Sequence, residues 1–387
     1  MSRRAAVVGV GQTQYRRRHS GRNTAELVRE AVTAALTDAQ MDLDAIGLVV
    51  GGVAPDALAG IDHVDMGSIA RPGIPYFRVN TGGATGSSAF LAGLTWIAAG
   101  RCDAVLVVAV ERMGHAVTAP KVFNSIFDPI YERDISLSTL SMVALRATMM
   151  IQKYGYTLEQ WAHLAARNSE LSLLNDTLES PRRFSAGDVL SSGVISWPIH
   201  KLEIGPVSEG ACAMVIAAEN RVGSRPAAWI RGASGLSDTY EMGSRISRAE
   251  GALVDVVTLR RCAAQAYRDA GVVDPAKEVD MVEIHAACAS SESMGYAPLG
   301  ICAPADGPRF LDSIVDGTAR IAVNPSAGAQ AANPVSATAM IRIAECALQI
   351  RGRAGRRQVD GIRLAVATGQ GGATQFSTAV VLGAEPS

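Results

Sequence analysis

A glycine-rich turn is the first place in this sequence where chemistry can be expected. Gly82 and Gly83 stand before a helical pattern, and glycine lets the backbone adopt a positive φ or approach a ligand closely. Thr85, Ser87 and Ser88 can cap that helix. The N-terminus of a helix presents free N–H groups and the positive end of its dipole to an oxygen or an anion. The stretch therefore predicts a binding site for an oxygen-bearing group.

His285 and Asn333 are polar residues at positions where an active-site loop is expected. His285 ends the apolar run 279–284, and imidazole exchanges protons near neutral pH, so His285 is our first candidate for a general base. The alternative for His285 is a structural hydrogen bond to the backbone or to water. Asn333 precedes a helical pattern, and its amide either donates to a substrate oxygen or caps the helix.

Three more candidates follow His285 closely along the chain. Tyr296 is either a catalytic hydroxyl or an aromatic side chain packed beneath a neighbouring segment. Cys288 is either an acid that donates a proton or a small buried residue. Glu292 either orients His285 or is a solvated carboxylate, and we favour the solvated carboxylate. The sequence alone leaves these alternatives open.

The elements that must position these residues form two copies of one α/β pattern. Strands without polar alternation are typical of sheets covered on both faces, so we expect stacked mixed sheets with helices between and outside them. We assign residues 1–225 to the first half, with an insertion at about 114–200, and residues 226–387 to the second half. In the first copy we expect strands at 5–10, 46–50 and 104–110 and a helix at 24–39. In the second copy we expect strands at 227–232, 279–285 and 362–368 and helices at 257–270 and 339–350. A strand at 208–218 ends the first half, and the insertion contains helices at 140–154 and 158–172.

Composition and charge narrow the class of protein. Apolar residues make up 48% and charged residues 19% of the 387 residues, which predicts a well-buried core. The net charge of -1 argues against nucleic acid or an anionic membrane surface as the main partner. No apolar run reaches the roughly 18 residues of a transmembrane helix. The six cysteines lack CxxC pairs or zinc spacing, so we expect reduced thiols, no metal and a cytoplasmic location.

The turn resembles the nucleophile loop of the thiolase superfamily, most closely its sterol-carrier-protein/lipid-transfer branch. That loop reads roughly V-N-x-x-C-[SA]-T-G-S, and Gly83 occupies the cysteine position. The residues that fit the pattern are Val79, Asn80, Ala84, Thr85, Gly86 and Ser87. The resemblance extends from Ala5 to Leu382. It implies a thiolase fold, in which two βαβαβαββ halves form a five-layered αβαβα sandwich.

The other thiolase loops are present with their reactive residues replaced. The family's H-D-C-F reads His285-Ala286-Ala287-Cys288, and Asn333 replaces the histidine that activates the nucleophile. The final C-x-G-G-G reads 368-TGQGG-372, without its cysteine, and Tyr296 partly matches the family's Y-E-x-L-G. Without a nucleophile no acyl-enzyme can form, so thiolase activity is not expected. The resemblance leaves Gly83, Gly371 and Gly372 as backbone donors toward a thioester oxygen.

Thiolase-like proteins without the nucleophile resemble either aldolases of steroid side-chain degradation or silent subunits of mixed complexes. We favour retro-aldol cleavage of a β-hydroxyacyl-CoA, with coenzyme A entering as part of the substrate and no bound cofactor. The alternatives are a silent subunit and an acyltransferase that uses Cys288. The resemblance further implies a homodimer and a possible small OB-fold acyl-CoA-binding subunit that completes a heterotetramer.

Overall fold

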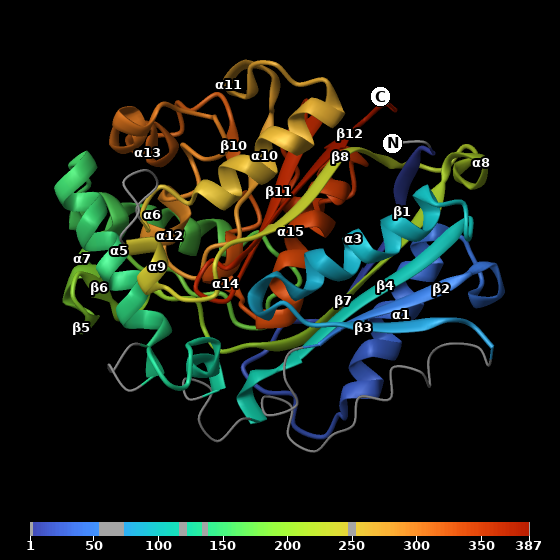
Figure 1. The fold of residues 1–387 in the computed structure, drawn as a ribbon, viewed down its shortest axis with the longest axis horizontal. Helices are drawn as coiled ribbons and strands as arrows, with labels where there is room; N and C mark the ends of the chain where they lie inside the picture. The colour runs from blue at the N-terminus through green and yellow to red at the C-terminus, as the bar shows by residue number, and fades with distance from the viewer. Residues whose placement is uncertain (1–2, 54–72, 116–121, 134–137, 247–252, 387) are drawn as a thin grey trace.

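The computed structural model describes residues 3–53, 73–115, 122–133, 138–246 and 253–386, and Figure 1 shows their arrangement. A ten-stranded sheet runs in the order β10-β9-β11-β12-β8-β1-β7-β4-β2-β3. Each half of the chain supplies five neighbouring strands. The first half supplies β1 (Ala5–Gln12), β2 (Leu48–Val53), β3 (Tyr76–Val79), β4 (Ala104–Arg112) and β7 (Glu209–Ala218), and the second supplies β8 (Ala228–Ser237), β9 (Met281–Glu283), β10 (Ala322–Val323), β11 (Leu364–Gly371) and β12 (Phe376–Gly383).

Helices lie between and outside the two halves of the sheet (Figure 1). The helices α1 (Thr24–Ala39) and α10 (Val257–Ala270) cover the outer faces, α1 against β1, β4 and β7, and α10 against β8 and β12. Between the halves, α3 (Thr85–Ala98) and α15 (Val335–Ile350) pack against each other and against strands of both halves. These layers confirm the expected α/β thiolase fold with its αβαβα order.

The two halves of the sheet are joined edge to edge. The strands β1 and β8 pair in antiparallel fashion, with Ala6 opposite Trp229 and Val7 opposite Ala228. Both halves also pack their outer helix in the same way, through a glycine on the strand beneath it. A Cβ added at Gly11 would stand 2.0 Å from the carbonyl oxygen of Ala31 on α1, and one at Gly232 would stand 2.0 Å from that of Ala266 on α10. The shared close approach is a structural sign of the predicted duplication.

Element boundaries differ from expectation around the second copy. The helix α15 begins at Val335, after the N-cap residue Pro334, and not at residue 339. The strand β9 ends at Glu283, because the backbone N–H groups of Ile284 and His285 donate to the side chains of Asn324 and Thr368 and leave the ladder. The short strands β3 and β10 had no apolar pattern from which they could be predicted.

The inserted segment packs against the second half and covers its loops. Both predicted helices are confirmed, as α5 (Thr139–Tyr154) and α6 (Leu158–Ser172), whereas residues 116–121 and 134–137 lie outside the described residues. The indole Nε1 of Trp161 on α6 donates to the hydroxyl of Ser293 at 3.0 Å. The smaller elements are α7 (Ala186–Ser191), β5 (Val194–Ser196), β6 (Ile199–His200), α8 (Glu219–Val222), α9 (Gly243–Ile246), α11 (Pro275–Glu278), α12 (Ala289–Ser293), α13 (Gly307–Val315) and α14 (Gly328–Ala331).

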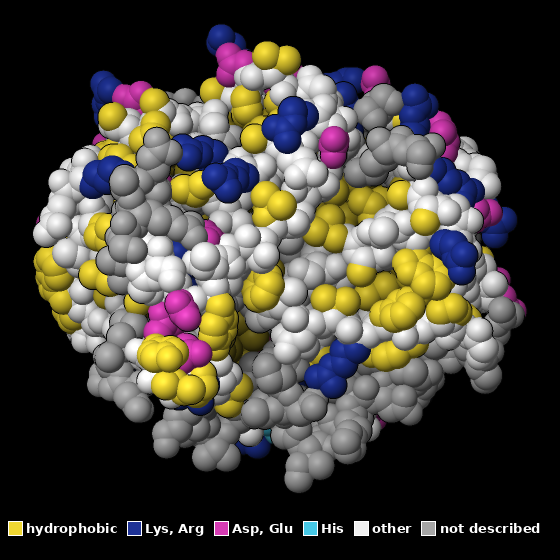
Figure 2. Space-filling view, in the orientation of Figure 1, with side chains coloured by type: hydrophobic (Ala, Val, Ile, Leu, Met, Phe, Trp, Pro, Cys, Tyr) yellow, Lys and Arg dark blue, Asp and Glu magenta, His cyan; other side chains and the backbone are white. Residues whose placement is uncertain are grey.

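One edge of the sheet carries exposed aromatic surface. The strand β3 is the outermost strand of the first half and pairs with β2. Phe77 on β3 is 45% exposed, and its ring lies 5.4 Å from that of Trp96 on α3. Figure 2 shows hydrophobic side chains gathered over α3 and β3 on this face. An edge of this kind is a template for pairing with another chain.

Candidate active site

His285 lies on the loop after β9 and is held by residues at the end of the neighbouring strand β11. The strands β9 and β11 run parallel, so the residues after them meet at the same edge of the sheet. The backbone N–H of His285 donates to the hydroxyl of Thr368 at 2.9 Å, and its ring Nδ1 accepts the backbone N–H of Gln370 at 3.1 Å. The side chain is 7% exposed. His285 is therefore fixed by backbone and hydroxyl contacts from the end of β11, the segment that resembles C-x-G-G-G.

The hydrogen bond from the backbone N–H of Gln370 determines which ring nitrogen of His285 carries the proton. Burial, with a smaller effect of the Arg342 charge, lowers the pKa of His285 to about 3, so the imidazole is neutral at physiological pH. Because Nδ1 accepts a hydrogen bond, the single proton of the neutral ring resides on Nε2. Such a ring donates through Nε2 and is a poor proton acceptor. The geometry favours a donor role for His285 over the role of base that its position suggested.

Gly83 lies directly against His285. Residues Gly82–Ala84 form a short 3-10 turn that leads into α3. A Cβ at Gly83 would stand 2.5 Å from the carbonyl oxygen of Gln370 and 3.1 Å from Cε1 of His285. The two loops therefore approach so closely that a side chain at residue 83 has no room without movement of the Gln370 backbone.

Gly371 and Gly372 complete this contact between the halves of the chain. A Cβ at Gly371 would stand 1.9 Å from the carbonyl oxygen of Thr81, and Gly372 has φ +63°, a conformation that favours glycine. The structure thus brings together Gly83, Gly371 and His285 from the predicted site. Thr368 and Gln370, which hold His285, were recognised only as positions in a motif, because their roles depend on backbone geometry.

Asn333 is half-buried at the start of α15, and its side chain does not cap the helix backbone. Its backbone N–H donates to the hydroxyl of Ser208 at 3.1 Å, and its Oδ1 accepts from the hydroxyl of Thr338 at 2.8 Å. No residue in the described ranges accepts a hydrogen bond from Nδ2 of Asn333. These contacts orient the amide and leave its two N–H groups for another molecule.

Tyr296 lies in the core of the second half, beneath the insertion. Its side chain is fully buried, its ring meets Phe310 edge-on at 5.1 Å, and its hydroxyl lies 3.4 Å from Oε1 of Glu292. Burial raises the pKa of Tyr296 well above its usual value, which opposes deprotonation. The packing alternative therefore fits Tyr296 better than catalysis.

Glu292 is not the solvated carboxylate that we expected. It is 1% exposed and accepts hydrogen bonds from Asn168 on α6 at 2.8 Å and from Gln330 on α14 at 3.3 Å. Burial raises the pKa of its carboxyl group. Glu292 thus ties the insertion to the loops around His285 and Asn333. A single sequence does not reveal this role, because the polar partners are distant along the chain.

Cys288 is buried at the N-terminus of α12 and has the features of a structural residue. It is 2% exposed, its Sγ lies 3.3 Å and 3.1 Å from the hydroxyl oxygens of Ser290 and Ser291, and burial raises the pKa of its thiol. The nucleophilic form of cysteine is the thiolate. We expect iodoacetamide to leave Cys288 unmodified in the folded protein at pH 7.5 and to modify it after unfolding in urea, as read by peptide mass spectrometry. Rapid labelling of the folded protein would contradict this assignment.

Glu111 is a buried acid that sequence analysis did not single out. It lies at the end of β4, where its carboxylate accepts the Ser336 hydroxyl of α15 and, at 2.9 Å, the backbone N–H of Arg112. Burial raises the pKa of Glu111 to about 7, and the nearby carboxylate of Glu209 also acts upward. A polar residue at the end of an apolar strand is typically exposed, so no sequence pattern singled out Glu111.

Stability should depend on pH through Glu111. Its pKa is raised in the folded protein, so its contribution to the free energy of unfolding is full below pH 4.5 and is lost as the pH rises through about 7. Relative to Glu111→Gln, the wild type should lose up to about 3 kcal/mol between pH 5 and pH 8. Urea unfolding at both pH values measures this difference. If the difference in the free energy of unfolding between the wild type and Glu111→Gln does not change with pH, the raised pKa of Glu111 is contradicted.

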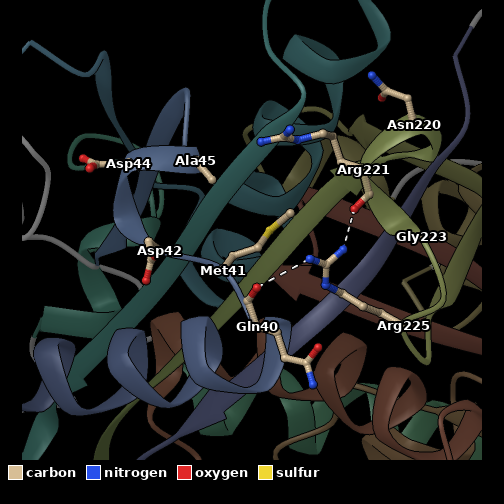
Figure 3. Close-up of a pocket in the computed structure, with 9 residues that line it drawn as sticks. All are labelled: Gln40, Met41, Asp42, Asp44, Ala45, Asn220, Arg221, Gly223 and Arg225. Carbon is tan, nitrogen blue, oxygen red and sulfur yellow. Dashed lines mark hydrogen bonds between the residues drawn. The ribbon is translucent and has the colours of Figure 1, made fainter.

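One cavity on the described surface lies away from these residues. A cavity of about 610 Å³ is lined by the turn after α1 and by α8, and Figure 3 shows its side chains. Its Arg225 donates to the carbonyl oxygens of Arg221 at 2.8 Å and Gln40 at 3.5 Å, a structural use of the guanidinium. In the part of the chain that the structure covers, no cluster of three or more metal-ligating side chains occurs. A search of the same residues finds no helix with the length and apolar character needed to cross a membrane.

Comparison with known proteins places this architecture in a family. Residues 5–176 match the model for the thiolase N-terminal domain, and residues 242–384 match the model described as thiolase C-terminal domain-like. The chain is 27% identical over 382 residues to acetyl-CoA acetyltransferase of Methanothermobacter thermautotrophicus, covering 96% of this chain and 97% of that protein. It is also 27% identical over 382 residues to human sterol carrier protein 2, covering 94% of this chain and 69% of that protein.

A solved structure supports the same fold at lower sequence identity. The structure described as "Ltp2-ChsH2(DUF35) aldolase" superimposes with a TM-score of 0.81 at 21% identity, over 98% of this chain and 97% of that one. At this identity the likeness concerns the fold. Together with the two family models, these findings show that the chain belongs to the thiolase superfamily, in its sterol-carrier-protein-2-like branch, with a thiolase-like function related to acyl-CoA.

Proposed function

We propose that the protein cleaves a carbon–carbon bond of a β-hydroxyacyl-CoA by a retro-aldol reaction, without a covalent enzyme intermediate. The observation that carries the proposal is the contact of Gly83 with Gln370 and His285, which leaves neither a nucleophile nor space for one at residue 83. A retro-aldol reaction needs no such nucleophile. It needs donors that stabilise the enolate of a thioester.

In the proposed mechanism, the chain binds the thioester oxygen through N–H groups. The neutral ring of His285 donates through Nε2, and Asn333 donates through Nδ2. The glycines at residues 83, 371 and 372 let the segments around His285 pack closely against each other and offer backbone N–H groups. The proton of the β-hydroxyl passes to a base as the carbonyl product forms. The electrons of the breaking bond between the α and β carbons move onto the thioester as an enolate. The α carbon then takes a proton and the shorter acyl-CoA leaves.

A neutral histidine suits this step better than an imidazolium. It donates a hydrogen bond to the developing oxyanion without transferring its proton, and the buried position strengthens the interaction because local water is excluded. Coenzyme A enters as part of the substrate in this proposal, and no resident cofactor is required. The same arrangement explains why a chain without the thiolase nucleophile keeps the loops around it.

We also propose that the active unit contains more than one chain. The exposed edge of β3 with Phe77, beside Trp96, supports a homodimer formed by antiparallel pairing of two β3 strands. The aldolase with the similar fold is described as a complex of Ltp2 with ChsH2(DUF35), which supports a second, acyl-CoA-binding subunit for this chain. Light scattering of the purified chain tests the proposed homodimer, and a monomer at micromolar concentration would contradict it.

The test of the proposed function is mass spectrometry of coenzyme A esters after the protein meets a branched β-hydroxyacyl-CoA without free coenzyme A. The reaction is run with and without a candidate DUF35 partner. A shorter acyl-CoA together with a carbonyl product is the expected result. Unchanged substrate in both reactions would overturn the proposal and favour the alternative of a silent subunit.

A further inference from the structure

Two arginines are buried where the insertion meets the loops of the site. Arg146 on α5 is 3% exposed, and its Nε donates to the carbonyl oxygen of Leu253 at 2.9 Å. Arg245 on α9 is also 3% exposed, and its Nη1 donates to the carbonyl oxygen of Ala373 at 2.5 Å and to the hydroxyl of Thr374 at 3.2 Å. Neither helix belongs to the duplicated core of the fold.

The guanidinium of Arg146 has unused hydrogen-bonding capacity. Its Nη2 is buried without a partner, and no carboxylate among residues 3–53, 73–115, 122–133, 138–246 and 253–386 forms an ion pair with it. Burial and the neighbouring charge of Arg245 lower the pKa of Arg146 to about 10, so the cation persists at neutral pH. A buried charge without a counterion is costly to the folded protein. An incoming anion would offset that cost.

The position of the two arginines connects them to the candidate site. Ala373 and Thr374, which bind Arg245, directly follow Gly371 and Gly372. On the other side, Cys288, which belongs to the loop that begins at His285, lies near enough to Arg146 to act electrostatically on the pKa of Arg146. The pair of cations therefore lies beside two of the loops that surround the proposed thioester site.

The surroundings of the arginines are apolar and adaptable. A small core cluster of this region consists of Phe127, Met142, Met242, Leu253 and Ala373, with Met149 packed against it. Methionine side chains adapt to irregular aliphatic ligands. Glu132 also reaches this region: its Oε1 accepts the backbone N–H of Gly243 at 3.0 Å, and its Oε2 is buried without a partner.

We propose that Arg146, with Arg245 beside it as a second positive charge, binds a carboxylate at the far end of the acyl group, so that the substrate is the coenzyme A thioester of a dicarboxylic acid. The proposal rests on the proposed function and specifies its substrate class. A guanidinium matches a carboxylate with two parallel N–H donors, and Arg146 retains donors for this purpose. The methionines accommodate the aliphatic chain between the thioester and the carboxylate.

The experiment compares matched ligands by calorimetry under conditions without turnover. The probes are saturated dicarboxylic acid monothioesters of coenzyme A from four to twelve carbons, each paired with the monocarboxylic thioester of the same length. At the best length, the dicarboxylic member should bind the wild type at least about tenfold more tightly than its partner. Equal affinity at every length would overturn the inference, whereas failure of all thioesters to bind would overturn the proposed function itself.

Substitutions separate recognition from structural support. Arg146→Met should remove the preference for the dicarboxylic member, leave binding of the neutral member within about twofold, and raise the melting temperature, because an unpaired buried charge is replaced by an apolar chain. Arg146→Lys should retain part of the preference. Arg268→Met, at an exposed position on α10, is the matched control and should change nothing. A preference that survives Arg146→Met, or a variant that fails to fold, would contradict the proposed role.

Discussion

Gly83→Cys is expected to lower the native activity about a hundredfold without producing thiolase activity, although it restores the residue type of the thiolase nucleophile. The new Cβ would stand 2.5 Å from the backbone oxygen of Gln370 and 3.1 Å from the His285 ring. Real Cβ atoms do not approach a backbone oxygen to 2.5 Å, so the end of β11 must move. We expect a loss of about 1–3 kcal/mol in the free energy of unfolding and a drop of about a hundredfold in kcat/KM.

The measurements for Gly83→Cys are urea unfolding, the native cleavage assay and thiolysis of acetoacetyl-CoA with free coenzyme A. Asn333 stands where thiolases have the activating histidine, so the new thiol would also lack its base. Gly187→Ala is the matched control, because a Cβ at Gly187 meets only the Ser185 hydroxyl, at an ordinary 3.7 Å. Cysteine-dependent thiolysis with unchanged stability would show that the space at residue 83 is larger than the structure indicates.

His285→Ala should lower kcat/KM by about a hundred- to a thousandfold, the usual effect of removing an oxyanion donor. The reason is that Nε2 is the donor of a neutral ring whose Nδ1 is engaged by Gln370. His285→Gln, which offers an amide donor, should recover part of the loss. Tyr296→Phe is the control in the same loop and should keep most of the activity, because its hydroxyl faces Glu292 in the core.

The pH dependence distinguishes a donor from a base at His285. Because its pKa is lowered to about 3, the ring stays neutral from pH 5 to 8, and protonation of His285 should not lower the rate in that range. Because the pKa of His285 is lowered in the folded protein, its contribution to the free energy of unfolding is present above pH 6.5 and is lost as the pH falls toward about 3. His285→Gln should remove this part of the acid sensitivity. A rate that falls with an apparent pKa near 6.5 and loses this dependence in His285→Gln would identify His285 as a base.

The fold was predictable because its strands are continuously apolar and its pattern occurs twice. Strands such as β4 and β7 are buried along their whole length, and the sequence shows this directly. The helix α15 was predicted to start too late because its first turn reads as part of a glycine- and proline-containing loop. Pro334 in fact serves as its N-cap. The short strands β3 and β10 depend on pairing with a neighbour and have little pattern of their own.

The site was predictable only in part, because its chemistry depends on contacts between distant segments. The motif positions led to His285, Gly83, Gly371 and Asn333, but the backbone N–H of Gln370 fixes the tautomer of His285, and no side-chain pattern encodes it. Buried charges were missed for a related reason. Arg146 on α5 and Glu111 at the end of β4 occupy positions that read as solvent-facing until the partner elements are placed.

The central claim is that carbon–carbon cleavage proceeds through an enolate without transfer of the acyl group to a new thiol. The most direct test is a reaction in deuterium oxide with added isotopically labelled free coenzyme A, followed by mass spectrometry of the acyl-CoA products. The expected product is a shorter acyl-CoA that keeps the original coenzyme A and carries one deuterium at its α carbon. Incorporation of the labelled coenzyme A into a product would establish thiolysis and contradict the account.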